Sequence, residues 1–454
     1  MNTFEKLQLL KSGKMTAEQN VKQFLAAVEK DDQRGKKINA FIAMNPSVLG
    51  DARRVDEKIK KGKAGRLAGL VVAVKSNISV LGLKTSCASK VLENYFGSYD
   101  ATVIKKIREE DGIIIGMTNM DEFACGSSGE TSAFGATQNP AALGKIPGGS
   151  SSGSAASVAA GFCDLSLGTD TGGSIRNPAS HCSVVGVKPS YASVSRYGLI
   201  DLSMSLDQIG TFSKDVYGSA LLLDVIRGKD AKDSISQDSK RLNLDNLGKT
   251  GKNITVGVLD LKISDDRIKK LIDLKIDTVC KKYGWKIKKI KIDFIDLAVE
   301  TYYPLVYVEF FSGTRKFNGR LFGKKIEDHA GVEVLRRILG GSEITKAEFG
   351  GRYYNRALKA KRIFGNEFAK VFKDVDCVII PTVPRLPHKI GEKISVEDMY
   401  KYDALTIPSN LAGNCSLSVP AGKIDNIPVG LQVICDVFQD EKMFGVASTI
   451  EKLN

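Results

Sequence analysis

Residues 147–188 read PGGSSSGSAASVAAGFCDLSLGTDTGGSIRNPASHCSVVGVK and contain two glycine–serine clusters, residues 148–154 and 168–174. Between the clusters, the sequence predicts a short helix of small residues over 155–161 and a buried strand over 162–167. Glycine lets a main chain approach a ligand closely, so amide N–H groups can face a developing negative charge. Composition alone also fits two flexible, turn-rich loops. The apolar segment between the clusters favours an ordered site over flexible loops.

A lysine stands at the end of an apolar run upstream of this stretch. Residues 70–74 read LVVAV, the pattern of a buried strand, and Lys75 follows directly. A strand that emerges into water commonly ends on lysine. A lysine that stays buried has a lowered pKa instead and can act as a base. The apolar pattern leaves both interpretations open.

Helical and strand-like segments alternate along most of the chain, which predicts an α/β sheet with buried strands. A capping box at Thr16 begins a predicted helix over 16–29, and another helix is predicted over 47–61. Later segments predict a β-α-β unit over 254–292, strands over 377–380, 416–419 and 429–434, and a polar surface connection over 234–252. We expect one domain over 1–454, with an N-terminal helical region (about 1–65), a core (about 66–215) and a helical insertion (about 293–375).

The composition is that of an ordinary globular protein with a positive net charge. Of 454 residues, 43% are hydrophobic and 26% charged, and the net charge is +14. The absence of a long apolar run or a charged-then-apolar leader predicts a cytoplasmic protein without a membrane segment. The lysines are spread over predicted helix faces, which favours a solvated surface over a dedicated nucleic-acid-binding face. Eight scattered cysteines and three histidines predict reduced thiols and no metal site.

Two kinds of serine chemistry are compatible with the clusters. Residues 149–153 match G-x-S-x-G, the α/β-hydrolase pattern with Ser151 as nucleophile. The chain offers three candidates for the histidine base of that chemistry: His181, His329 and His388. Polar or proline-rich surroundings disfavour the last two. The other option is a neutral Lys75 acting on a serine, although sequence alone does not pair this lysine with a particular serine.

The two clusters and the strand-ending lysine resemble the amidase signature family, and the resemblance extends over nearly the whole chain. Residues 67–78 resemble the family's lysine strand, residues 148–151 its first serine loop and residues 168–176 its nucleophile loop. The resemblance implies an amidase-signature fold, in which helices cover both faces of a large mixed central β-sheet.

The same resemblance implies a role for each residue of the site. Lys75 corresponds to the base, Ser150 to a bridging serine that the family holds at a cis peptide, and Ser174 to the nucleophile. The 24-residue step between the two serines equals the family's spacing. Ser151 is then a bystander. The resemblance places the oxyanion among main-chain N–H groups around Ser174 and three residues before it: Thr171, Gly172 and Gly173.

The flanking segments are similar to one branch of the family, the glutamine-hydrolysing A subunits of tRNA-dependent amidotransferases. The similar segments are 120–123, 126–132, 195–199, 205–210, 336–340 and 403–408. In that branch a Tyr, an Arg and an Asp bind free glutamine. They map to Tyr302 or Tyr303, to Arg337 (Arg336 is a weaker match) and to Asp403. Arginine can hold the α-carboxylate through two hydrogen bonds, and aspartate can accept from the α-ammonium.

The sequence also departs from the family pattern. Ser76 stands where aspartate is usual, and Ser152 where glycine is usual. Residues 414–416 replace a Leu-Pro-Gly-like run, and residues 303–320 match loosely. The loose match leaves the choice between the two tyrosines open.

The resemblance implies a glutaminase that releases ammonia for amidation of Glu-tRNA(Gln), Asp-tRNA(Asn) or both in a partner protein. It implies a heterotrimer with subunits B and C, no cofactor on this chain, and ATP with Mg²⁺ in the partner. The alternative is a stand-alone amidase for small or fatty amides, which has no use for a paired Arg337 and Asp403. A catalytically silent scaffold is a third hypothesis, disfavoured by the intact Lys-Ser-Ser set.

Overall fold

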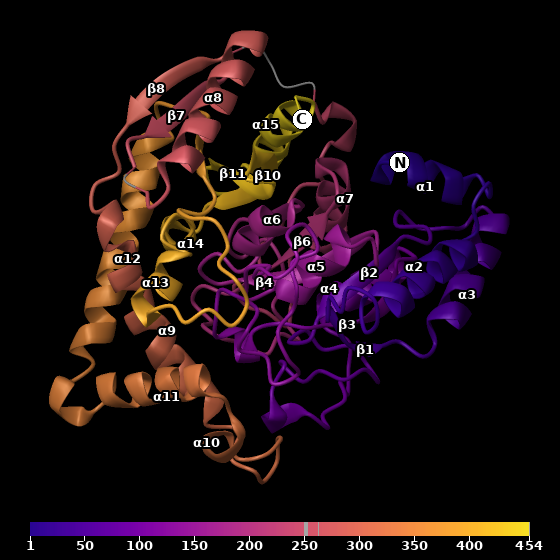
Figure 1. The fold of residues 1–454 in the computed structure, drawn as a ribbon, viewed down its shortest axis with the longest axis horizontal. Helices are drawn as coiled ribbons and strands as arrows, with labels where there is room; N and C mark the ends of the chain where they lie inside the picture. The colour runs from indigo at the N-terminus through magenta and orange to yellow at the C-terminus, as the bar shows by residue number, and fades with distance from the viewer. Residues whose placement is uncertain (249–252, 262, 454) are drawn as a thin grey trace.

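A computed structural model describes residues 1–248, 253–261 and 263–453. In chain order, its strands are β1 (Phe41–Met44), β2 (Val71–Lys75), β3 (Ile113–Thr118), β4 (Leu165–Asp170), β5 (Val185–Lys188), β6 (Gln208–Ser213), β7 (Thr255–Leu259), β8 (Lys286–Ile290), β9 (Cys377–Pro381), β10 (Cys415–Ile424) and β11 (Ile427–Cys435). Within the described residues they form one 11-stranded sheet, ordered β1-β3-β2-β4-β6-β5-β10-β11-β9-β7-β8 (Figure 1). Strand β2 pairs in parallel with β3 and β4, whereas β4, β6, β5, β10 and β11 pair antiparallel. The predicted mixed sheet is confirmed.

Helices cover both faces of this sheet, as expected. They are α1 (Thr3–Lys11), α2 (Ala17–Asp31), α3 (Val48–Lys60), α4 (Thr102–Glu109), α5 (Ser152–Ala159), α6 (Arg176–Cys182), α7 (Val216–Ile226), α8 (Asp266–Tyr283), α9 (Ala298–Thr314), α10 (Ile326–His329), α11 (Val332–Ile344), α12 (Arg352–Val371), α13 (Val396–Lys401), α14 (Ile407–Ala412) and α15 (Asp440–Glu451). Alternate residues of a strand face opposite sides of a sheet. Accordingly, Val72 and Val74 pack in one core with α4 and α7, and Val71 and Ala73 in another with α2, α3 and α5.

The helices of the region over 293–375 form a further layer against the core of the molecule. Helices α9, α11 and α12 share an apolar cluster that includes Phe310, Ile338 and Phe364, and this cluster also contains residues of the loop after β3, such as Phe123. These helices lie along one side of the sheet and descend below it (Figure 1). The division of the chain into regions stays a prediction.

The elements of the opening stretch begin at other positions than predicted. Helix α5 already begins at Ser152, and β4 runs from Leu165 to Asp170, into the second cluster. Antiparallel pairing with β6 extends the strand, because Gly168 lies opposite Gly210 and Asp170 opposite Gln208. Tertiary pairing therefore overrides the turn-like composition of this cluster.

Other local predictions are confirmed in detail. The Thr16 side chain accepts a hydrogen bond from the Gln19 N–H at 3.0 Å, and the Gln19 side chain accepts from the Thr16 N–H at 2.9 Å. Part of the predicted surface connection, residues 249–252, lies outside the described residues. Among the helices that the structure describes, none has the length and apolar character needed to span a membrane.

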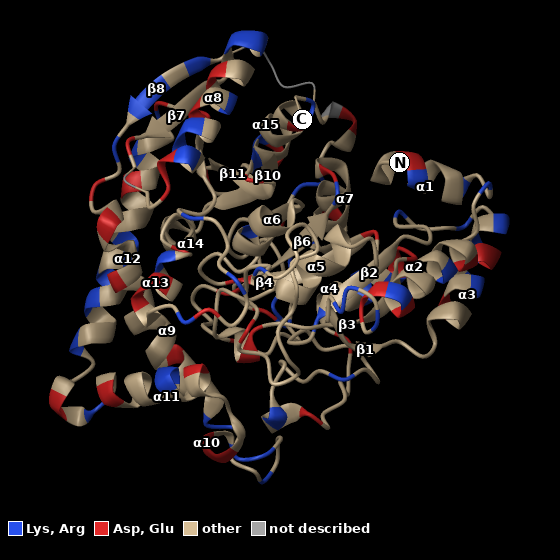
Figure 2. Cartoon of the chain, in the orientation of Figure 1, with Lys and Arg blue, Asp and Glu red and all other residues tan. Residues whose placement is uncertain are grey.

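The positive charge is distributed along the periphery of the molecule. Lysine and arginine follow β8 and the long helix α12 on one side of the fold (Figure 2). On β8, Lys286, Lys288 and Lys289 are exposed, and Lys288 pairs with Asp374 at 2.9 Å. Exposed lysines on an edge strand also discourage pairing with another sheet.

Candidate active site

Lys75, the last residue of β2, is buried at the carboxyl end of a parallel strand pair. Its side chain has no solvent exposure. Its Nζ lies 2.8 Å from each of three hydroxyl oxygens, those of Ser150, Ser151 and Thr169. The parallel register between β2 and β4, with Val74 opposite Leu167, places Thr169 beside the lysine. Of the two interpretations of Lys75, the structure therefore supports the buried lysine and not a strand end that emerges into water.

Burial lowers the pKa of Lys75 to about 7, although the nearby acids Asp121, Asp170 and Asp207 raise it in part. A lysine with such a pKa has a substantial neutral population near pH 7. Neutral lysine has a lone pair that can accept a proton from a serine hydroxyl. The site thus contains a lysine whose pKa suits the role of base that was predicted for it.

The first cluster brings Ser150 and Ser151 to the lysine together. The Gly149–Ser150 peptide bond is cis, as the resemblance implied. Ser151 was expected to be a bystander, but its hydroxyl contacts Lys75 Nζ and also donates to the Thr169 carbonyl at 3.1 Å. It also accepts from the Thr169 N–H at 3.2 Å. The Ser151 and Thr169 hydroxyls thus both contact the Lys75 amine directly.

The predicted nucleophile, Ser174, lies in the loop between β4 and α6. It is 6% exposed, and its carbonyl accepts a hydrogen bond from the Ser151 N–H at 3.1 Å. Among the described residues, no hydrogen bond is recorded for the main-chain N–H groups of residues 171–174. Four free donors next to a serine are the arrangement that an oxyanion hole requires.

A buried network of charged and polar side chains holds the two ends of the loop that carries Ser174. Asp170 and Arg176 are fully buried and pair at 2.9 Å, and Arg176 holds the pKa of Asp170 at about 2 against the effect of burial. Arg176 also donates to side-chain oxygens from the last part of the chain: those of Ser409, Asn410 and Gln432. Sequence reasoning did not identify this network, because its partners lie far apart in the chain.

Two glycines of the loop allow close approach of predicted substrate-binding residues. A Cβ on Gly172 would lie 2.8 Å from the Tyr302 ring. A Cβ on Gly173 would lie 2.6 Å from an Asp403 carboxylate oxygen. Tyr302 from α9 and Asp403 before α14 therefore lie against consecutive residues of the loop that carries Ser174. The structure thus brings Asp403 and one of the two candidate tyrosines to the serine loop.

Burial also changes the ionisation of these two residues. It raises the pKa of Asp403 to about 8, although Asn177, which donates a hydrogen bond at 3.2 Å, lowers it. It raises the pKa of the Tyr302 hydroxyl well above its ordinary value. Asp403 is therefore largely protonated near pH 7 when no cation is near it, and an approaching ammonium would favour the carboxylate.

Arg337 and Tyr303 contact residues outside the serine loop. Arg337 is 4% exposed, and its Nε donates to Glu333 at 3.0 Å. Its guanidinium lies 5.8 Å from the centre of the Tyr303 ring. Tyr303 in turn stacks on Tyr400 with ring centres 3.9 Å apart. The weaker candidate Arg336 also pairs with Glu333 but is more exposed.

Comparison with known proteins agrees with this geometry. The family model described as Amidase matches residues 20–444. The chain belongs to the amidase family. A protein from Methanocaldococcus jannaschii, named as the A subunit of glutamyl-tRNA(Gln) amidotransferase, is 50% identical over 437 residues, which cover 96% of this chain and 99% of that protein.

Solved structures of other amidases share the fold over the whole chain. The A subunit of glutamyl-tRNA(Gln) amidotransferase from Thermotoga maritima has a TM-score of 0.85 and 37% identity, covering 100% of this chain and 94% of that one. The peptide amidase of Stenotrophomonas maltophilia has a TM-score of 0.85 and 26% identity, covering 100% and 96%. The predicted fold and family are confirmed.

The histidine-based alternative finds no support in this amidase. His181 is fully buried, and burial lowers its pKa to about 3. His388 lies between the Tyr402 hydroxyl at 2.9 Å and Glu130 at 3.1 Å, and His329 is exposed at the end of α10. The hydroxyl of Ser151 forms its recorded hydrogen bonds with Lys75 Nζ and with the main chain of Thr169, and none of these partners is a histidine.

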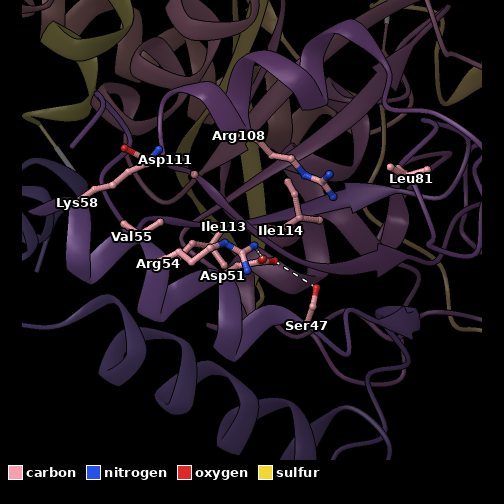
Figure 3. Close-up of a pocket in the computed structure, with 11 residues that line it drawn as sticks. Ser47, Asp51, Arg54, Val55, Lys58, Leu81, Arg108, Asp111, Ile113 and Ile114 are labelled. Carbon is pink, nitrogen blue, oxygen red and sulfur yellow. Dashed lines mark hydrogen bonds and ion pairs between the residues drawn. The ribbon is translucent and has the colours of Figure 1, made fainter. Parts of the chain in front are cut away.

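A pocket elsewhere in the amidase is separate from this site. A cavity of about 350 Å³ lies between α3 and the start of β3, with Asp51, Arg54 and Arg108 among its lining residues (Figure 3). It opens next to Ile113, whereas Lys75 lies opposite Thr118 at the other end of the same parallel pair. Its charges are compensated, since Arg54 pairs with Asp51 and Arg108 pairs with Asp100.

Proposed function

We propose that this amidase is the glutamine-hydrolysing A subunit of a tRNA-dependent amidotransferase. The observation that carries the chemistry is the fully buried Lys75, whose Nζ lies 2.8 Å from the Ser150 hydroxyl. Full-length relatives at about 50% identity, named as A subunits of glutamyl-tRNA(Gln) amidotransferases, support the substrate and the assembly.

In the proposed mechanism, neutral Lys75 accepts a proton from Ser150, and Ser150 accepts one from Ser174. The Ser174 oxygen attacks the side-chain amide carbon of glutamine, and the oxygen of that carbonyl becomes negatively charged. The free N–H groups of residues 171–174 stabilise this charge. The proton returns to the amide nitrogen, the C–N bond breaks, and ammonia leaves. Water then attacks the acyl-enzyme, which releases glutamate and restores the Ser174 hydroxyl.

The substrate side of the site suits a free amino acid. Asp403 would accept hydrogen bonds from the α-ammonium, and Arg337 would bind the α-carboxylate. Tyr302 is the better candidate for the tyrosine contact, because its ring lies against Gly172, whereas Tyr303 stacks on Tyr400. A stand-alone amidase for apolar amides would gain nothing from a buried arginine and a buried aspartate on the substrate side of its site.

The proposal extends to an assembly with subunits B and C. In it, ammonia passes to a partner that activates the aminoacyl-tRNA with ATP and Mg²⁺. The names of the relatives point to Glu-tRNA(Gln) as the acceptor. Assaying Glu-tRNA(Gln) and Asp-tRNA(Asn) in parallel distinguishes the acceptors.

The decisive experiment measures ammonia release from glutamine by the chain with and without the partner subunits. We expect glutamine-dependent release that the partners enhance and that Ser174→Ala abolishes. Ser264→Ala is the control, because Ser264 is exposed and remote in sequence from the site. Rapid hydrolysis of simple amides with no response to glutamine would favour the stand-alone amidase and contradict the proposal.

A further inference from the structure

Glu333 on α11 is a buried carboxylate with three side-chain donors around it. The residue is 6% exposed. It accepts a hydrogen bond from Arg337 Nε at 3.0 Å and one from the Tyr400 hydroxyl at 3.2 Å, and it also pairs with Arg336. Because a buried charge is costly unless it is paired, these contacts constrain Glu333 and its partners to one arrangement.

The contact with Glu333 uses only one edge of the Arg337 guanidinium. Among the described residues, the recorded hydrogen bond of Arg337 is the one from Nε. Both Nη groups remain available for a further partner. A guanidinium held at one edge still presents a planar pair of donors, which matches the two oxygens of a carboxylate. Arg337 is also near enough to influence the ionisation of Tyr302 and Asp403.

Tyr400 connects the arginine to the other half of the substrate site. It belongs to α13, three residues before Asp403, and its ring stacks on Tyr303 while its hydroxyl contacts that of Tyr307 at 2.8 Å. The preceding residue, Met399, accepts a hydrogen bond through its carbonyl from the Ser127 hydroxyl at 3.0 Å. Helix α13 is thereby fixed both to α9 and to the loop after β3.

We propose that Glu333 is a positioning residue that orients Arg337 and, through Tyr400, couples it to Asp403. Arg337 and Asp403 together then select amides that carry a free α-carboxylate at a set distance from an ammonium. This inference rests on the proposed function, since it assumes that Arg337 binds the substrate carboxylate. The alternative is that Glu333 and Arg337, which lie one helical turn apart on α11, form an ion pair with a structural role only.

The test compares glutamine with 4-aminobutanamide, which is glutamine without its α-carboxylate. We expect Glu333→Gln to raise the KM for glutamine about tenfold or more, because a neutral amide holds the arginine more weakly than a carboxylate and its NH2 group cannot accept a hydrogen bond, with kcat changed less than about twofold. The same variant should lower kcat/KM for 4-aminobutanamide by a much smaller factor, because this amide lacks the carboxylate that Arg337 binds. Tyr400→Phe should raise the KM for glutamine by a smaller factor. Glu343→Gln is the matched control, because Glu343 is exposed on the same helix and pairs with Lys346.

Two further measurements separate positioning from a structural role. In an Arg337→Ala background, Glu333→Gln should have no additional effect on the KM for glutamine. Equal losses of kcat/KM for both amides, or an unchanged KM for glutamine, would overturn the proposal. Should Glu333→Gln fail to fold, Tyr400→Phe answers the same question, because it removes a single hydroxyl. A wild-type protein that releases no ammonia from glutamine would instead contradict the proposed function.

Discussion

Two lysines of this amidase share their burial but differ in their partners. Lys75 is the last residue of β2 and Lys188 the last residue of β5, and neither side chain is exposed to solvent. Burial lowers the pKa of each to about 7. Lys75 faces three hydroxyl groups. Lys188 donates to the main-chain carbonyls of Pro189, at 3.1 Å, and of Asn414.

The difference shows that burial alone does not make a base. A hydroxyl can donate a proton to a neutral amine and pass on another, whereas a carbonyl can only accept. The surroundings of Lys188 therefore suit a fixed donor that ties β5 to the segment before β10. The surroundings of Lys75 suit proton transfer. Substitutions at both lysines test this division.

Replacing Lys75 should have the largest effect. Lys75→Met removes the base but keeps an apolar side chain of similar length, so we expect kcat for glutamine hydrolysis to fall by about 10² to 10⁴. Rapid-quench measurement of the acyl-enzyme checks whether the loss lies in the attack by Ser174. A variant that keeps the wild-type rate would reject the role of Lys75 as base.

The pH dependence should follow the lysine. Because the neutral form of Lys75 is the active one and its pKa is lowered to about 7, kcat at saturating glutamine should fall about tenfold per pH unit below this value and level off above it. Lys188→Met should leave this acid limb in place. A limb that disappears in that variant would assign the titration to Lys188 instead.

Lys188→Met should affect folding rather than chemistry. It leaves the carbonyls of Pro189 and Asn414 without a donor, which we expect to lower the free energy of unfolding by about 1 to 3 kcal/mol. Denaturant unfolding measures this loss, with the exposed Lys423→Met as a control expected within about 0.5 kcal/mol of the wild type. A folded Lys188→Met protein with a kcat as low as that of Lys75→Met would contradict the comparison.

The smallest effect is expected at Ser151. Ser151→Ala removes one of three hydroxyls around Lys75, so kcat should fall about two- to tenfold, the effect of one neutral hydrogen bond. Ser157→Ala is the matched control on α5, the helix that begins directly after Ser151, because its hydroxyl donates to the Ser154 carbonyl at 2.9 Å and does not contact the lysine. An unchanged kcat in Ser151→Ala would return Ser151 to the bystander role that the resemblance implied.

The alternating α/β pattern was predictable from local sequence, whereas the role of Lys75 as base was implied by the family resemblance. Five apolar residues before Lys75 predict a buried strand, and the spacing of the two clusters identifies the family. Thr169 was missed because β4 extends past the apolar run only through its pairing with β6. The contact of Ser151 with Lys75 was missed as well, since the direction of a side chain at the start of a helix depends on the tertiary fold.

The substrate side was harder to predict for a related reason. Tyr302 and Tyr303 are adjacent on α9, and neither is exposed, so an apolar pattern cannot decide which ring reaches Gly172. Arg336 and Arg337 differ in burial, but both contact Glu333. The contact of Tyr302 with Gly172 distinguishes the tyrosines, and the deeper burial of Arg337 distinguishes the arginines.

The close approach of Tyr302 and Asp403 to Gly172 and Gly173 has an evolutionary consequence. The reacting groups proposed for this site all come from residues 75–174, whereas the groups proposed to bind the substrate come from residues 302–403. The substrate selectivity of such a protein could therefore change through substitutions in the second segment while the first segment stays the same. The peptide amidase that shares this fold at 26% identity is a natural subject for tracing such an exchange.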